Sequence, residues 1–121
     1  MNNEPTDDSS KVYVSDTSGP DCYVAFFEDD GETGYLYVSD REKQEIVKHV
    51  QIYTNSKRLD VSSDDVRVVW SSDGTKCGVI IWGGMRGIID LEKGVEGRAF
   101  LETRSSPPIS DPSWLKGFAL G

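Results

Sequence analysis

Residues 66–94 constrain the fold more than any other part of the chain. They read VRVVWSSDGTKCGVIIWGGMRGIIDLEKG, with three apolar runs separated by the short turns SSDG and GGMRG. Runs of this length, joined by tight glycine-containing turns, are typical of an antiparallel meander. Asp73 and Gly74 are expected at the tip of the first turn, with Gly74 at a positive φ. The side chains that we expect in the core of the meander are Val68, Trp70, Val79, Ile81, Ile89 and Leu91.

The first half of the chain predicts a second hairpin. Residues 22–28 and 35–38 are rich in aromatic and β-branched side chains, and the polar sequence between them contains two glycines. A short strand near residues 12–14 precedes this hairpin. Residues 46–53 fit either a helix or a strand, and the sequence VQIY favours a strand after a helical turn at residues 41–44.

The length of 121 residues is close to that of one domain. Residues 1–10 are polar and lack periodicity, so we expect a disordered N-terminal tail there. Residues 11–121 are expected to form a single globular domain, which ends in a proline-rich extension from about residue 104.

Twelve glycines in a chain of this length indicate many turns and few long helices. We expect a last strand at residues 98–101, with Trp114 and Phe118 of the extension packing back on the sheet. The predicted class is α+β or mainly β: a single domain with an antiparallel meander sheet of about five or six strands and little helix.

The negative charge is concentrated in the first third of the chain. The net charge is −8, and residues 1–40 contain ten Asp or Glu against one Lys. Nucleic-acid binding requires clustered Lys and Arg, which this sequence lacks, so we expect no nucleic-acid partner. The acidic region either steers a basic protein partner toward the chain or is a solvated region that keeps the protein in solution.

Catalytic and metal-binding motifs are not evident in the sequence. His49 is the single histidine, no GxSxG motif occurs, and no pair of cysteines or histidines has zinc-ligand spacing. We therefore expect no enzymatic activity, no cofactor and no metal. Cys22 and Cys77 occur in apolar surroundings and are expected to be buried thiols, with a disulfide as the alternative.

No apolar run approaches the roughly 18 to 20 residues that span a bilayer. The first ten residues have neither a basic start nor an apolar stretch. We therefore expect a cytoplasmic protein without a membrane partner.

Four motifs follow one another along the chain: GYLYVSD at residues 34–40, VQIYTN at 50–55, VRVVWSSDG at 66–74 and GIIDLEKG at 87–94. Their order resembles the bacterial family catalogued as domain of unknown function 2251. The resemblance covers residues 23–100 and leaves the segment after Phe100 outside. Its motifs are patterns of strands and turns, so it implies a fold and supplies no mechanism.

The aromatic side chains provide the remaining candidates for a site. In strands, alternate side chains point to opposite faces, so about half of the aromatic residues are expected in the core and half on an exposed face. Candidate partner-binding residues, from the predicted acidic tip and the strand after it, are Asp29, Asp30, Glu32, Tyr35 and Tyr37. Candidate pocket residues against the sheet are Tyr53, Trp70 and Trp82.

These observations favour a small interaction protein without catalysis. An immunity-type protein that neutralises a basic partner or toxin fits the acidic first third of the chain. The alternative is a small-molecule binding domain, or an enzyme with an unrecognised catalytic group, that uses a pocket against the sheet. The sequence does not specify the partner, the ligand or the oligomeric state.

Overall fold

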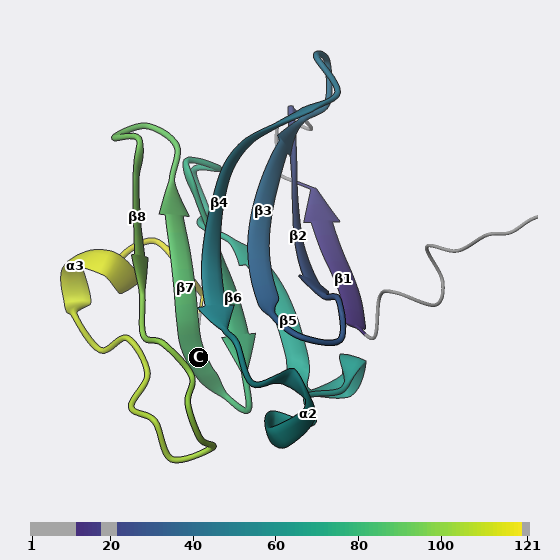
Figure 1. The fold of residues 1–121 in the computed structure, drawn as a ribbon. Coiled ribbons are helices and arrows are strands. Elements are labelled where there is room, and N and C mark those ends of the chain that lie inside the picture. Colours follow the sequence, from purple (N-terminus) through teal and green to yellow (C-terminus); the bar gives the residue numbers. More distant parts are fainter. Residues whose placement is uncertain (1–11, 18–21, 120–121) are drawn as a thin grey trace, which may run out of the picture.

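The computed structural model describes residues 12–17 and 22–119, in which eight strands form two antiparallel meanders (Figure 1). The first sheet has the order β1 (Val12–Thr17), β2 (Tyr23–Asp29), β3 (Gly34–Asp40) and β4 (Glu45–Tyr53). The second has the order β5 (Val66–Trp70), β6 (Lys76–Ile81), β7 (Gly84–Asp90) and β8 (Val95–Arg98). Within these described residues, helix is limited to α2 (Ser56–Leu59), the 3-10 turn η1 (Ser63–Asp65) and α3 (Pro112–Leu115).

The predicted class is confirmed, because the structure is mainly β, antiparallel and poor in helix. It contains eight strands in two sheets, where the sequence predicted five or six in one. The disordered tail predicted for residues 1–10 lies outside the described residues. No helix in the described part of the chain is both long and apolar enough to cross a membrane.

The two sheets pack against each other and share one apolar core. β4 lies against β7 and β8, and β1 lies against β5, as the two layers of Figure 1 show. A Cβ atom on Gly87 would lie 2.5 Å from the Cδ1 atom of Ile52, so a larger residue there would force the Ile52 side chain to move where β7 approaches β4. The fully buried aliphatic and aromatic side chains of this core include Phe27, Leu36, Ile52, Tyr53, Val79, Ile81, Ile89 and Leu101.

The C-terminal segment, residues 102–119, covers the outer face of the second sheet. Buried Ile80, Met85 and Ile88 form a second apolar cluster on that face. The side chains of the segment that pack on this cluster are Ile109, Trp114, Leu115 and Phe118. The predicted packing of Trp114 and Phe118 on the sheet is therefore confirmed, and β6 and β7 are buried on both faces.

Hydrogen bonds hold this segment in place as well. The backbone N–H of Ile109 donates to the carbonyl of Met85 at 2.8 Å. The Lys76 ammonium donates to the Trp114 carbonyl at 3.1 Å, and its Nζ atom lies 5.5 Å from the centre of the Phe118 ring. The segment is thus fixed at several points along the sheet.

The predicted meander of residues 66–94 corresponds to β5, β6 and β7. Val68, Val79, Ile81 and Ile89 are buried, as predicted, and the two remaining predicted core residues, Trp70 and Leu91, are half-buried against the core. The turn between β5 and β6 has its predicted form. Gly74 has a φ of 74°, and its N–H donates to the Ser71 carbonyl at 2.9 Å.

Three other local predictions have mixed outcomes. Residues 41–44 form a turn and β4 follows, so the strand interpretation of residues 46–53 is confirmed. The last strand is Val95–Arg98, so its predicted position at residues 98–101 is wrong. The sequence GVEGR, with two glycines and no aromatic residue, gave little strand signal there.

The two cysteines differ in burial. Cys77 is buried, as predicted, whereas Cys22 is exposed, so the expectation of a second buried thiol is wrong. Cys22 lies immediately before β2 and outside the core, and the two residues are not joined in a disulfide.

We predict that replacing Ile81 by Ala lowers the free energy of unfolding by about 2 to 5 kcal/mol, because a fully buried side chain leaves a cavity between the sheets. Denaturant melts measure this change. Val95→Ala is the matched control, since Val95 is 44% exposed and should lose less than about 0.5 kcal/mol. Equal losses in the two variants would contradict the position of Ile81 in the core.

We also predict that Cys77 is chemically unreactive in the folded protein. Burial raises the pKa of its thiol to about 12, so the reactive thiolate is absent at ordinary pH. In a Cys22→Ser variant, iodoacetamide at pH 8 should modify Cys77 only after denaturant is added. Rapid modification of the native variant, read by mass spectrometry, would show that β6 is not buried as described.

Candidate functional site

Aromatic rings form a continuous row across the outer face of the first sheet. The ring centres lie 5.5 Å apart between Tyr13 and Phe26, 5.0 Å apart between Phe26 and Tyr37, and 5.6 Å apart between Tyr37 and Tyr35. These three pairs are stacked, and the ring of His49 lies 5.8 Å from Tyr35 and 6.2 Å from Tyr37. We call these five residues the aromatic ladder.

The strand register explains why these side chains meet. Phe26 lies opposite Tyr37 across the β2–β3 pair, and Tyr37 lies opposite His49 across the β3–β4 pair. Leu36 and Val38, the residues on either side of Tyr37 in β3, are fully buried in the core. Alternation along the strands therefore places the aliphatic side chains inward and the aromatic ones on the other face.

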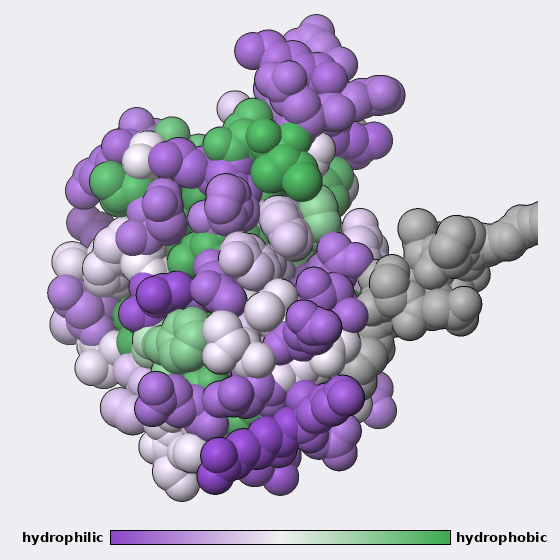
Figure 2. All heavy atoms as spheres, viewed as in Figure 1, coloured by the Kyte–Doolittle hydropathy of each residue, from purple (hydrophilic) through white to green (hydrophobic). Residues whose placement is uncertain are grey.

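The ladder is accessible to solvent. Tyr13 is 56% exposed, His49 is exposed, and Phe26, Tyr35 and Tyr37 are half-buried. Above this part of the molecule in Figure 2, the hydrophilic turn between β3 and β4 projects beyond an apolar patch. Ile46 and Val47, which are 53% and 39% exposed, lie at this end of β4.

Carboxylates surround the ladder on the side of β2. Burial raises the pKa of Tyr37, and the negative charges of Glu28 and Asp30 contribute to the same shift. Glu28 lies opposite Tyr35 in the β2–β3 register and thus on the same face. Tyr35 and Tyr37 therefore lie close to the negative charge of Glu28.

Two of the three predicted acidic residues are exposed at the tip between β2 and β3. Asp30 accepts hydrogen bonds from the backbone N–H groups of Thr33 at 2.8 Å and Glu32 at 2.9 Å, which lower the pKa of its carboxyl. Glu32 is exposed, and its carbonyl accepts a hydrogen bond from the N–H of Ser56 at 3.2 Å. Both residues face solvent at the tip.

The expectation that Asp29 is an exposed partner-binding residue is wrong. Its side chain is fully buried and accepts hydrogen bonds from the Tyr53 hydroxyl at 2.6 Å, the Ser56 hydroxyl at 2.8 Å and the Gly31 N–H at 2.7 Å. A Cβ atom on Gly34 would lie 2.5 Å from the Tyr53 ring, so the glycine leaves the space that this ring occupies. Asp29 therefore stabilises the end of the sheet and does not meet a partner.

The predicted pocket at Tyr53, Trp70 and Trp82 does not form. Tyr53 has no exposed surface, because its ring lies in the core and its hydroxyl donates to Asp29. The indole N–H of Trp70 donates to the carbonyl of Asp16 at 3.1 Å, and the Arg104 guanidinium lies 4.2 Å from the centre of the Trp82 ring. Because Tyr53 has no exposed surface, it cannot line an open pocket together with the two tryptophans.

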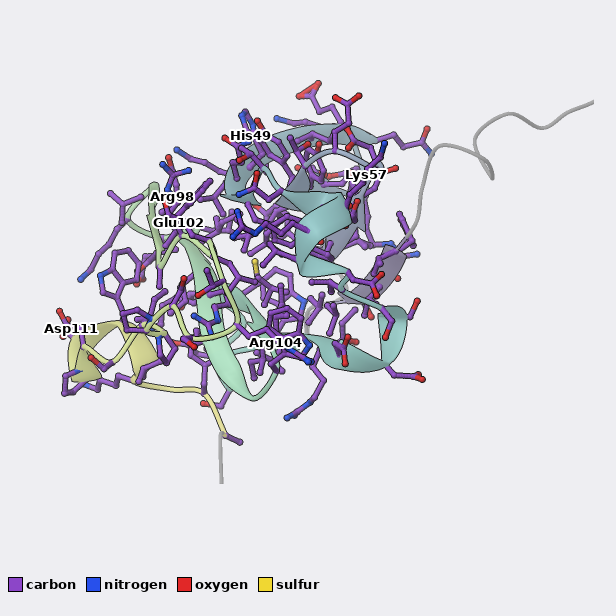
Figure 3. All side chains as sticks on the ribbon, turned by 60° about the horizontal axis from the view of Figure 1, so that its bottom comes forward. His49, Lys57, Arg98, Glu102, Arg104 and Asp111 are labelled. Carbon is purple, nitrogen blue, oxygen red and sulfur yellow. The ribbon has the colours of Figure 1, made fainter. Side chains whose placement is uncertain are left out.

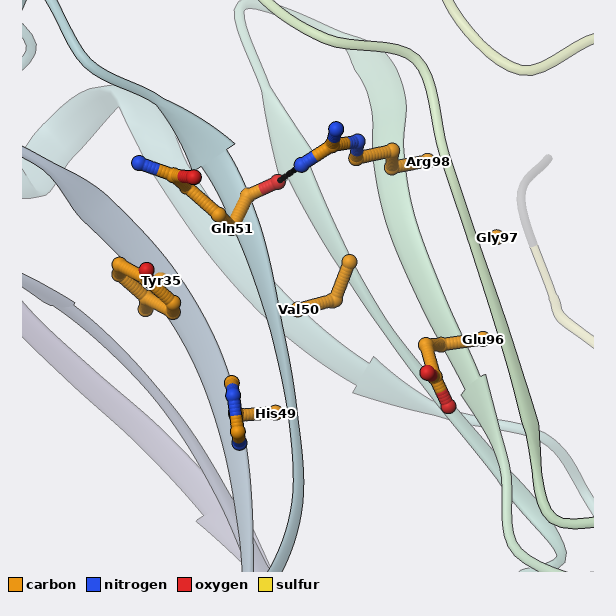
Figure 4. A pocket seen from close by; sticks show the side chains of 7 residues that line it. All are labelled: Tyr35, His49, Val50, Gln51, Glu96, Gly97 and Arg98. Atoms are coloured by element: carbon orange, nitrogen blue, oxygen red, sulfur yellow. Dashed lines mark hydrogen bonds between the residues drawn. The ribbon is translucent and has the colours of Figure 1, made fainter.

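A groove between β4 and β8 adjoins the ladder (Figure 4). Its volume is about 340 Å³. Tyr35 and His49 belong both to the ladder and to this groove. The residues that line the groove are Tyr35, His49, Val50, Gln51, Glu96, Gly97 and Arg98.

Several charged or titratable side chains of the described chain lie apart from one another. Figure 3 shows His49, Lys57, Arg104 and Asp111 at separate places around the molecule. Across residues 12–17 and 22–119, no group of three or more His, Cys, Asp or Glu side chains is placed to hold a metal ion. The ladder and its groove are therefore the best-defined candidate site of the described chain.

The sequence analysis identified Tyr35 and Tyr37 but missed the other parts of this site. Phe26 and His49 lie on the same face because of the register between strands, which the spacing along one strand does not reveal. Arg98 reaches the groove because β8 lies beside β4, a contact between residues far apart in the sequence. The alternation of Tyr35 and Tyr37 with Leu36 was the one available signal.

We predict that Tyr53→Phe destabilises the protein by about 1 to 3 kcal/mol, because the buried Asp29 carboxylate loses a hydrogen bond that water cannot replace. Tyr13→Phe removes a hydroxyl from a side chain that is 56% exposed and is the matched control. Thermal and denaturant melts of both variants provide the comparison. Unchanged stability of Tyr53→Phe would contradict the buried polar cluster.

Comparison with known proteins gives one match. The family model described as "Uncharacterized protein conserved in bacteria (DUF2251)" matches residues 7–116. The match extends through most of the C-terminal segment, so the expectation that the segment after Phe100 lies outside the resemblance is wrong. No curated protein and no solved structure matches the chain.

Proposed function

This chain belongs to the bacterial family DUF2251, and because that family is described as uncharacterised, we propose a function from the surface of the protein itself. The protein is a non-catalytic binding module that docks a basic protein partner on the aromatic ladder. The accessible row of rings on the first sheet is the observation that carries this proposal.

The two outer faces of the protein differ in a way that supports this function. The outer face of the second sheet holds Ile80, Met85 and Ile88, and the protein's own C-terminal segment covers it. Tyr13 and Tyr37 lie on the outer face of the first sheet and remain accessible. An uncovered row of aromatic rings is typical of a surface that meets another protein.

The aromatic residues of the ladder can each contribute a large share of the binding energy at an interface. Tyrosine rings bury a large area with few rotatable bonds, so ordering them at an interface costs little entropy. Stacking of Tyr35 on Tyr37 and of Phe26 on Tyr37 restricts these rings before any partner arrives. Because the rings are already ordered, less entropy is lost on binding, which increases the affinity for a partner.

The charge distribution favours a basic partner. Ten of the acidic residues fall within residues 1–40. Of these, Glu28, Asp30, Glu32 and Asp40 lie on or between β2 and β3, where their negative field steers cations toward the first sheet. Glu28 and Asp30 extend this field to the Tyr37 ring. Lys and Arg side chains of a partner bind favourably over such rings through cation–π contacts.

Within this function, the role that we propose is that of a cytoplasmic immunity-type protein, which neutralises a basic toxin by occupying its surface. The negative net charge argues against nucleic acid and anionic membranes as partners. The alternative is binding of a small molecule, which the groove between β4 and β8 favours.

Pull-downs from the source cell test the proposal with a Tyr35→Thr/Tyr37→Thr variant. Threonine retains strand propensity, so the rings are lost while the sheet persists. We expect the wild type to recover a basic partner whose association weakens as salt rises, and the double variant to lose it. Asp30→Asn/Glu32→Gln should slow association more than it accelerates dissociation.

Arg67→Thr is the control, since Arg67 is exposed on β5 of the other sheet. It should recover the partner as the wild type does. Equal recovery by the wild type and the Tyr35→Thr/Tyr37→Thr variant, with both folded in melts, would rule out the ladder as the interface. Absence of any partner would favour the small-molecule alternative.

A further inference from the structure

His49 is the one member of the aromatic ladder whose side-chain type ordinarily changes charge near neutral pH. It is the single histidine of the chain and is exposed on β4. Its ring centre lies 5.8 Å from that of Tyr35 and 6.2 Å from that of Tyr37. Figure 4 shows the side chains of His49 and Tyr35 next to each other on neighbouring strands. One imidazole therefore lies beside two of the rings on which the proposed partner docks.

Two titratable neighbours of this imidazole keep their charge over the pH range in which histidine titrates. Burial raises the pKa of Tyr37, so its hydroxyl stays protonated. Hydrogen bonds from the backbone of Thr33 and Glu32 lower the pKa of Asp30, so its carboxyl stays ionised. A change of charge at His49 is therefore not offset by either group.

Acidic side chains approach His49 from two sides. On β2, Glu28 lies opposite Tyr35 and thus on the face of the ladder. On β8, Glu96 lines the same groove as His49, and its Oε2 atom lies 3.3 Å from the Nζ atom of Lys48 on β4. Because Lys48 balances the charge of Glu96, the negative charge at the tyrosine rings comes from the β2 side. The other acidic residues of β3, β4 and β7 lie at strand ends: Asp40, Glu45 and Asp90.

The basic side chains of β7 and β8 are engaged by backbone carbonyls. Arg98 of β8 donates to the carbonyl of Gln51 at 3.0 Å, and Figure 4 shows its guanidinium group at that end of the groove, apart from His49. On β7, which packs against β4, Arg86 is buried and donates to the carbonyl of Ser106 in the C-terminal segment. His49 is thus the side chain that brings a positive charge to the ladder when it takes up a proton.

A protonated imidazole opposes a docked cation in two ways. Its charge lies beside the rings of Tyr35 and Tyr37, so it repels a Lys or Arg side chain placed over either of them. It is also a cation in its own right, so it competes with the partner for favourable positions against the same rings. The neutral imidazole has neither effect.

From this arrangement we propose that His49 is a proton-operated switch on the aromatic ladder. The ladder accepts a cationic side chain while the imidazole is neutral and rejects it once the imidazole is protonated. Docking and proton uptake weaken each other by the same factor, because coupling between two binding events is reciprocal. The switch rests on the proposed function, to which it adds regulation of the same surface by pH.

NMR titrations of the full chain with a defined peptide test the switch. The probe is acetyl-Gly-Arg-Gly-Arg-Gly-Arg-Gly-amide, and the same peptide with citrulline in place of arginine has nearly the same shape without the charge. The ring signals of Tyr37 and the single set of imidazole signals from His49 report contact with the ladder. Spectra are recorded at low salt, at about pH 7.5 and about pH 5.5.

We expect the arginine peptide to shift both sets of signals saturably at the higher pH and the citrulline peptide to leave them unchanged. At the lower pH, the affinity of the wild type should fall by about fivefold or more, because the imidazolium repels the peptide. The fall should follow the protonation curve of the imidazole recorded without peptide. Saturating peptide should move the midpoint of that curve to lower pH.

Two substitutions at position 49 separate the charge of the imidazole from other effects of acid. His49→Gln removes the titrating group, so its affinity should be nearly the same at both pH values. His49→Lys carries a permanent positive charge, so it should bind weakly at both. The position is exposed on β4, and melts at both pH values check that the variants are folded.

An equal loss of affinity on acidification in the wild type and His49→Gln would overturn the switch. Unchanged wild-type affinity at a pH where the imidazole is fully protonated would overturn it as well. Both results leave binding at the higher pH intact. Failure of the ladder gives a different result: at the higher pH, the arginine peptide shifts neither set of signals or binds Tyr35→Thr/Tyr37→Thr as tightly as the wild type. That result would overturn recognition of cations by the ladder, and the switch with it.

Discussion

The packing of the C-terminal segment on Ile80, Met85 and Ile88 determines which outer face the described residues leave accessible. Two sheets present four faces, of which two are buried against each other in the common core. The segment covers the third with Trp114, Phe118 and their neighbours. The remaining face carries the aromatic ladder. The proposed interface thus follows from how the chain covers its own apolar surface.

A buried polar cluster determines how the acidic tip beside this face is held. Asp29 at the end of β2 binds Tyr53 of β4 and Ser56 of α2, which ties three elements together. The next residue, Asp30, uses its carboxylate to bind the backbone of the turn. The two neighbouring aspartates therefore have different roles: Asp29 is buried, and Asp30 is exposed where a partner can contact it.

Much of the fold followed from local patterns in the sequence. The continuous apolar run at Val79, Ile80 and Ile81 predicted a strand buried on both faces, and the structure buries it between the core and the C-terminal segment. The Asp-Gly turn at Gly74 was predictable because a tight hairpin requires a positive φ there. Such features depend on residues within one or two strands.

The remaining features depend on contacts between distant segments. Asp29 shares the inward alternation of Phe27, which indicates burial, yet its partners Tyr53 and Ser56 lie more than twenty residues away. The groove at Arg98 requires β8 to lie beside β4, and no local pattern specifies that pairing of layers. Sequence alternation assigns side chains to faces, whereas the arrangement of the sheets decides which faces meet.

Photo-crosslinking in the living cell tests the central claim, that the free face of the first sheet is the binding surface, most directly. The photoreactive residue p-benzoylphenylalanine would replace Tyr13, the most exposed ring of the ladder, or Arg67 on the second sheet. The account predicts one covalent adduct with a basic protein from position 13 and none from position 67. Adduct formation from position 67 with none from position 13 would contradict it.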